Sequence, residues 1–149
     1  MSKQDNKEIR KVIDINKDAV DFYSDAKSKA KDNTVKDIFQ KFEKLHNDVV
    51  INLQNYVRQN GGEPEAENTV AGRVGQFWGD IKAKISNDVD ESLISSLEEA
   101  EDRCIHAVSD AADNKSLSPE TRIVLKQEKT LLQKTHDYMK IMKDNAKAA

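Results

Sequence analysis

Hydrophobic residues recur every three or four positions over most of this chain, a spacing that places them on one face of an α-helix. The pattern predicts four long helices, which span about residues 4–31, 34–60, 88–113 and 119–146. Charged and polar residues occupy the other faces of these helices. We therefore expect an all-α fold, in which four amphipathic helices bury their hydrophobic faces together as one domain of residues 1–149.

The predicted helix ends carry residues that favour the start or the end of a helix. Thr34 and Asp88 each have an acidic residue three positions later, as in a capping box. Ser118 stands just before a proline, which is well tolerated at the first position of a helix. Gly61 and Gly62 follow the second helix, because glycine readily adopts the left-handed conformation that ends one.

The three connections between the helices differ in length. Those near residues 32–33 and 114–117 are short, so each joins two helices into an antiparallel hairpin. Residues 61–87 are too many for such a turn, and residues 69–86 within them have helical periodicity. About 16 helical and about ten extended residues are enough to travel the ~40 Å length of a long helix. The sequence therefore predicts a long crossover that contains a short helix.

Two hairpins joined by a long crossover is the connectivity of a ferritin-like four-helix bundle, and we predict this fold. The alternative is an up-down-up-down bundle in which residues 61–87 are an insertion. The composition agrees with either, since the 149 residues include only 5 Gly and 2 Pro. That scarcity of turn-forming residues argues against a β-sandwich, a barrel or a loop-rich α/β fold. It also leaves no glycine-rich loop of the kind that binds phosphate.

Charge is distributed unevenly along the chain. The net charge is −3, which argues against a strongly basic nucleic-acid-binding protein. Residues 61–114 carry 13 acidic and 4 basic side chains, whereas the segments before and after are net basic. We expect the acidic segment to pack against the basic ones within the domain; an acidic docking surface is the alternative.

The remaining features bear on location. Cys104 is the only cysteine, so no disulfide forms within the chain and a reducing compartment is the simpler interpretation. The first residues lack the hydrophobic stretch of a signal peptide, and no uninterrupted hydrophobic run exceeds three residues. We expect a soluble, cytoplasmic protein without a membrane span.

A few polar residues fall on the hydrophobic faces. Asn16, His46 and Glu101 lie near the middles of their helices and are expected to share one layer of the bundle, with Glu128 about one turn away. One interpretation is a hydrogen-bonded polar layer, in which Glu101 or Glu43 orients His46 and the layer sets the register of the helices. We prefer this interpretation, with no cofactor.

The other interpretation is a metal site for iron or manganese, whose candidate ligands are Glu43, His46, Glu101 and Glu128. Glu43 and His46 form the E-x-x-H pair that di-iron bundles take from each of two helices. The fourth helix has Gln133 where a second such pair would require a glutamate. The first helix is expected to direct Asp14, Asp18, Asp21 and Asp25 to solvent, so the set of ligands is incomplete.

Other reactive or aromatic side chains have structural explanations. Cys104 is predicted to be a small core residue, since no base stands beside it, and His106 to face solvent. Phe77 and Trp78 are expected to anchor the crossover, with an exposed docking patch as the alternative. No catalytic constellation can be identified, so we predict no catalytic residues.

The chain resembles a bacterial family of ferritin-like four-helix-bundle proteins whose shared domain is of unknown function. The resemblance covers about residues 9–145 and rests on these segments: Val12-Ile13-Asp14 with Asp18 and Phe22, Asn60-Gly61-Gly62-Glu63-Pro64, Val70-Ala71-Gly72 with Trp78, Glu98-Glu99-Ala100-Glu101-Asp102, and His136-Asp137. It implies the ferritin-like fold with a helix in the crossover, and no established activity. Ala19 and Ala100 stand where the family pattern has glycine.

Together these observations predict a non-catalytic protein that acts through its surface, by binding an unknown protein partner or by self-association, and that is associated with stress survival. Nucleic acid is not an expected partner. The alternative function is that of a ferritin-like metalloprotein with iron or manganese in the bundle core.

Overall fold

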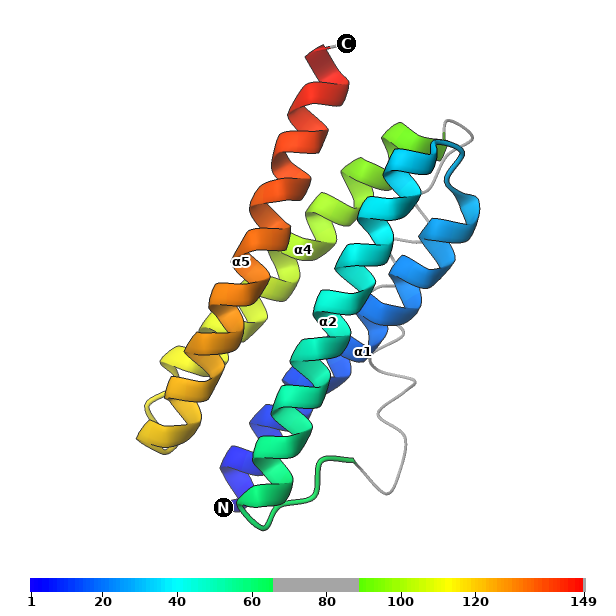
Figure 1. The fold of residues 1–149 in the computed structure, drawn as a ribbon. Helices are drawn as coiled ribbons and strands as arrows, with labels where there is room; N and C mark the ends of the chain where they lie inside the picture. Colours follow the sequence, from blue (N-terminus) through cyan, green and yellow to red (C-terminus); the bar gives the residue numbers. More distant parts are fainter. Residues whose placement is uncertain (66–88, 149) are drawn as a thin grey trace.

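The computed structural model describes residues 1–65 and 89–148, which form four α-helices (Figure 1). The helices are α1 (Lys3–Lys29), α2 (Asn33–Gln59), α4 (Val89–Asp113) and α5 (Pro119–Ala148). Their bounds lie within two residues of the predicted ones. The all-α class is confirmed, since the described part of the chain contains no strand.

Local side-chain and backbone contacts set the helix ends. Asp32 caps α2, because its Oδ1 accepts hydrogen bonds from the amides of Thr34 (2.7 Å) and Val35 (3.3 Å). The prediction that Thr34 is the capping residue was therefore wrong by two positions. Ser118 caps α5 as predicted, and its Oγ accepts from the amide of Thr121 at 3.3 Å.

The end of α2 is a Schellman motif at the predicted glycines. Gly61 has a φ of +74°, and its amide donates to the carbonyl of Arg58 at 3.2 Å. The amide of Gly62 donates to the carbonyl of Val57 at 2.9 Å. These two bonds satisfy carbonyl groups that have no partner inside the helix.

The helix directions establish how the two hairpins are connected. Near the N-terminus lie the start of α1, the ends of α2 and α4 and the start of α5; the other ends gather at the opposite pole (Figure 1). Helices α2 and α4 therefore run in the same direction, and the end of α2 and the start of α4 lie at opposite poles of the bundle. The up-down-up-down alternative is wrong. The predicted helix at 69–86, with Phe77 and Trp78, lies outside the described residues.

The hydrophobic core is divided into two clusters along the bundle. The cluster nearer the N-terminus draws on all four helices and includes Ile9, Leu53, Val108 and Leu125. The cluster at the other pole includes Tyr23, Phe39, Leu97 and Met139. Contacts within each hairpin are more extensive than contacts between hairpins. No helix among the described residues is both long and hydrophobic enough to cross a membrane.

A salt bridge and a hydrogen bond link the acidic segment to the basic ends, as the charge distribution suggested. Glu65 lies 3.7 Å from Lys17, and Asp102 lies 3.1 Å from His136. Both contacts are partly exposed, so each contributes little to the free energy of unfolding. The candidate site lies between the two clusters of the hydrophobic core.

Candidate functional site

One buried polar residue from each helix lies between the two hydrophobic clusters. These residues are Asn16 of α1, His46 of α2, Glu101 of α4 and Thr135 of α5, and none is more than 1% exposed. Asn16, His46 and Glu101 thus share one layer, as predicted from their positions along the helices. We call these four residues, together with Tyr23, the polar layer.

Hydrogen bonds connect the polar layer around His46. Its Nδ1 lies 2.7 Å from Asn16 Oδ1, and its Nε2 lies 2.6 Å from Glu101 Oε1. Asn16 Nδ2 donates to the carbonyl of Val12 at 2.8 Å, which leaves Oδ1 as the acceptor and places a proton on His46 Nδ1. The hydroxyl of Tyr23 also donates to Glu101 Oε1, and its ring stacks on His46 with centroids 5.5 Å apart. These contacts join α1, α2 and α4.

The electrostatic environment keeps the neighbouring acidic groups protonated. Burial raises the pKa of Tyr23 well above its usual value, and the charge of Glu101 and the hydrogen bond to it raise it further. Burial, followed by the charge of Glu101, raises the pKa of the Cys104 thiol in the same way. Cys104 is therefore a buried, neutral core residue, as predicted, rather than an activated nucleophile.

The four metal-ligand candidates occupy three separate surroundings. Of these four, His46 and Glu101 contact each other directly. Glu43 pairs with Lys27 of α1 at 3.0 Å, so Glu101 and not Glu43 orients His46. Glu128 Oε2 accepts from Asn52 Nδ2 at 3.5 Å, and Asn52 is about 9 Å further along α2 than His46.

This donor set does not fit a di-iron site. Among residues 1–65 and 89–148, no group of three or more His, Cys, Asp or Glu side chains is arranged to hold a metal ion. One atom of the polar layer, Glu101 Oε2, is nevertheless buried without a hydrogen-bond partner. Such an atom costs about 1–3 kcal/mol in free energy of folding.

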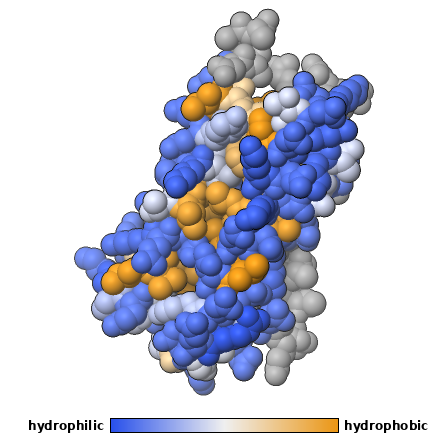
Figure 2. Space-filling view, in the orientation of Figure 1, coloured by the Kyte–Doolittle hydropathy of each residue, from blue (hydrophilic) through white to orange (hydrophobic). Residues whose placement is uncertain are grey.

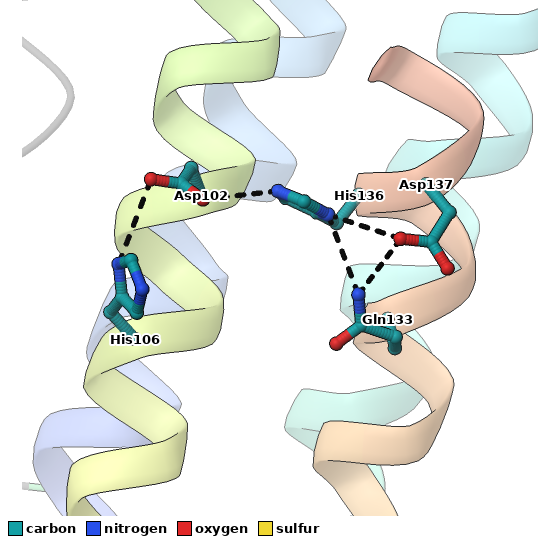
Figure 3. Close-up of polar contacts among 5 residues, drawn as sticks. All are labelled: Asp102, His106, Gln133, His136 and Asp137. Atoms are coloured by element: carbon teal, nitrogen blue, oxygen red, sulfur yellow. Dashed lines mark hydrogen bonds and ion pairs between the residues drawn. The ribbon is translucent and has the colours of Figure 1, made fainter. Parts of the chain in front are cut away.

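A second polar cluster lies at the surface where α4 faces α5 (Figure 3). His136 stands between two carboxylates, with Nε2 3.1 Å from Asp102 and Nδ1 3.2 Å from Asp137. Gln133 also donates to Asp137 Oδ1 at 2.8 Å, and His106 lies 3.6 Å from the other oxygen of Asp102. The contacts run as a chain from α4 to α5 and do not converge on one point, so they tie the hairpin together.

His106 is 72% exposed, as predicted, whereas His136 is only 15% exposed. The sequence offered no indication that Asp102 is the partner of His136. The reason is that the pair lies on two helices 34 positions apart.

A third polar contact, between α1 and α5, is not predicted by the sequence. Asp5 is almost fully buried, and its carboxylate accepts from the amide (3.2 Å) and hydroxyl (2.6 Å) of Ser118 and the hydroxyl of Thr121 (2.9 Å). Burial alone raises the pKa of Asp5, but the hydrogen bonds together outweigh it and the net pKa is lowered. Asp5 thereby attaches the first turn of α1 to the first turn of α5.

Comparison with known proteins adds a family and no activity. The model of a domain of unknown function, DUF2383, matches residues 5–114, which include α2, α4 and α1 from Asp5 onward. No curated protein and no solved structure matches the chain. The matched residues include four members of the polar layer but not Thr135.

Proposed function

Because the chain belongs to the family of DUF2383, a domain of unknown function, we propose a function from its own geometry: a non-catalytic helical-bundle protein that acts by binding protein through an exposed hydrophobic surface. The polar layer supports the non-catalytic part of the proposal. Its side chains are at most 1% exposed, so a substrate has no route to their polar atoms without separating the helices.

The observation that carries the proposal is the exposure of large hydrophobic side chains on α5. Ile123 is 56% exposed, Tyr138 47% and Ile141 57%. On the face seen in Figure 2, hydrophobic residues also gather along the seam where α5 faces α2. The ring of Tyr138 packs edge-on against Phe42 of α2, with centroids 5.8 Å apart, so the exposed residues continue into this seam. Exposed hydrophobic side chains that continue into such a seam mark a protein-binding site.

Photo-crosslinking in the native cell tests the proposal directly. A photoreactive residue is introduced at Ile141, and at Asn55 as an exposed control on α2. We expect an adduct of defined mass from position 141, lost when Ile123→Glu is added, and none from position 55. No adduct from position 141, or equal labelling from both positions, would contradict the proposal.

A metal-binding function is the second candidate, and one observation favours it. Glu101 Oε2 is a buried carboxylate oxygen without a hydrogen-bond partner, next to the imidazole of His46. The ferritin-like interpretation, with Glu43, His46, Glu101 and Glu128 around iron or manganese, stays a prediction because these residues do not converge. Elemental analysis of protein purified without a chelator or an affinity tag tests it. Near-stoichiometric metal that is lost in His46→Ala would establish it and overturn the proposal above.

Cytoplasmic location and an association with stress survival also stay predictions. The location rests on the single cysteine, and fractionation of cells with an antibody to the chain tests it. The role in stress is tested by comparing survival of a deletion strain complemented with the wild type or with Ile123→Glu/Ile141→Glu. Equal survival without complementation would contradict that role.

A further inference from the structure

The outer face of α5 has a regular arrangement of exposed residues. Ile123 and Ile141 are 18 positions apart, which is five turns of an α-helix, so they lie on the same side about 27 Å from each other. Between them the same side presents exposed polar residues. We call the following residues the α5 outer face: Ile123, Lys126, Gln127, Thr130, Lys134, Asp137, Tyr138 and Ile141.

This face is complementary to itself when a second copy is turned end to end. A two-fold interface brings residue i against j and, by symmetry, j against i. If two α5 helices pack antiparallel with the axis at the level of Leu132, Ile123 of each copy lies opposite Ile141 of the second copy. The two most exposed isoleucines are then buried against each other at both ends of the contact.

The charges agree with the same register. Lys126 and Asp137 lie on the same flank of the α5 outer face. Lys126 is six positions before the level of Leu132, and Asp137 is five positions after it. Each Lys126 is therefore opposite Asp137 of the second copy, which makes two equivalent ion pairs. Gln127 and Tyr138 are matched on the other flank, and Thr130 meets Lys134 near the centre. Complementary charge of this kind selects the register of an interface.

We propose that two copies of this chain associate through their α5 outer faces, antiparallel about a two-fold axis at the level of Leu132. The inference rests on the proposed function and specifies its partner. One helix face is smaller than the ~800 Å² per partner of a standard interface, so the dimer dissociates on dilution.

Sedimentation tests the association itself. Over about 5–500 μM, the weight-average mass of the wild type is expected to rise from 16.8 kDa toward twice that value. Ile123→Glu and Ile141→Glu are each expected to weaken association at least about tenfold. Ile51→Glu is the matched control, since Ile51 is 44% exposed on α2 and should change nothing. A wild type that stays monomeric at every concentration, or equal effects of all three variants, overturns the inference.

Disulfide trapping tests the antiparallel register. Ile123→Cys and Ile141→Cys are prepared as separate proteins and oxidised with oxidised glutathione, alone or as an equal mixture. In the proposed dimer a 123–141 pair is within disulfide reach, while the two copies of position 123 are about 27 Å apart. We expect crosslinking in the mixture at least about tenfold faster than in either protein alone. Equal rates in all three samples overturn the register.

The crosslinking experiment of the preceding section separates the two proposals. An adduct of position 141 with twice the mass of the chain supports both. An adduct with a different protein, together with a wild type that is monomeric, overturns the second-copy inference and leaves the proposed function standing.

Discussion

The contribution of each residue of the polar layer to stability depends more on its hydrogen-bond partners than on its own burial. His46 and Glu101 are both almost fully buried, and the 2.6 Å contact between Nε2 and Oε1 satisfies each of them. Removal of one member leaves the other buried without that partner, which costs more than the pair itself contributes. The layer is therefore a coupled unit, and mutations in it are expected to be non-additive.

A double-mutant cycle measures this coupling. We expect Glu101→Leu and His46→Leu each to lower the free energy of unfolding by about 3–5 kcal/mol, because each leaves a buried polar group unpaired. The double variant should lose at least ~1 kcal/mol less than the sum of the two, since it leaves no unpaired member of the pair. Urea denaturation at pH 7 gives the three values. Strict additivity would show that the two residues do not act together.

Asp18 supplies a pH-dependent contribution from another part of α1. Burial, followed by the charges of Asp21 and Asp14, raises the pKa of Asp18 to about 6, and its Oδ2 has no hydrogen-bond partner. The folded state therefore binds more protons than the unfolded state between about pH 4 and pH 6, so the stability contributed by protonated Asp18 is lost as the pH rises through 6.

Asp18→Asn should accordingly raise the melting temperature at pH 7 and raise it less at pH 4. Thermal unfolding of the wild type and the variant across this range measures the difference. Asp110→Asn is a suitable control, because Asp110 is an exposed carboxyl on α4. The explanation fails if the difference between wild type and Asp18→Asn is the same at both pH values.

At the scale of elements, contacts at the helix ends fix how the helices are placed relative to one another. Ser118 caps the start of α5, and Asp5 of α1 accepts a hydrogen bond from the Ser118 hydroxyl. Such a contact satisfies amide groups at the helix start and places a negative charge near the positive end of the helix dipole. The start of α1 and the start of α5 are consequently stabilised together.

Asp5→Ala is expected to lower the free energy of unfolding by about 1–2 kcal/mol at pH 7, because it removes these hydrogen bonds. The pKa of Asp5 is lowered, so its stabilisation is present above the usual carboxyl pKa and is lost as the pH falls through the lowered value. Urea denaturation at pH 7 and at pH 2.5 should therefore show a smaller difference at the lower pH. Gln4→Ala, an exposed neighbour, is the control and should have little effect.

Gly61 decides the end of α2 through its backbone conformation. Its φ is +74°, and a Cβ added there meets nothing within 4 Å, so the cost of a side chain is conformational only. We expect Gly61→Ala to cost about 1 kcal/mol and Gly61→Asn to cost less, since asparagine tolerates the left-handed region. Thermal unfolding compares them. An asparagine variant no more stable than the alanine variant would rule out this explanation.

The sequence anticipated the elements better than their contacts, and particular residues show why. The bounds of the helices were predicted within two residues because periodicity and turn-forming residues are local signals. His46, Asn16 and Glu101 were assigned to one layer because each lies near the middle of its helix. Asp5 was missed because its partner Ser118 is 113 positions away, and nothing near Asp5 marks it as buried.

At the scale of the whole molecule, two antiparallel hairpins stand side by side, and α2 and α4 run in the same direction (Figure 1). The helices that pack most extensively against each other are antiparallel, so their dipoles oppose one another favourably. The polar layer crosses this arrangement at mid-height and joins the hairpins through the His46–Glu101 contact. Helix α5 completes the bundle and presents the exposed hydrophobic residues on which both proposals depend.

The sequence by itself determined the number of long helices, their bounds and their pairing into hairpins, because these follow from hydrophobic periodicity, caps and loop length. Only the tertiary structure decided that Glu101 rather than Glu43 orients His46, and that Asp102 is the partner of His136. Periodicity assigns a residue to a face of its helix. A hydrogen bond depends on the rotation and axial shift of two helices to within a few tenths of an ångström, and these are set by packing of the whole core.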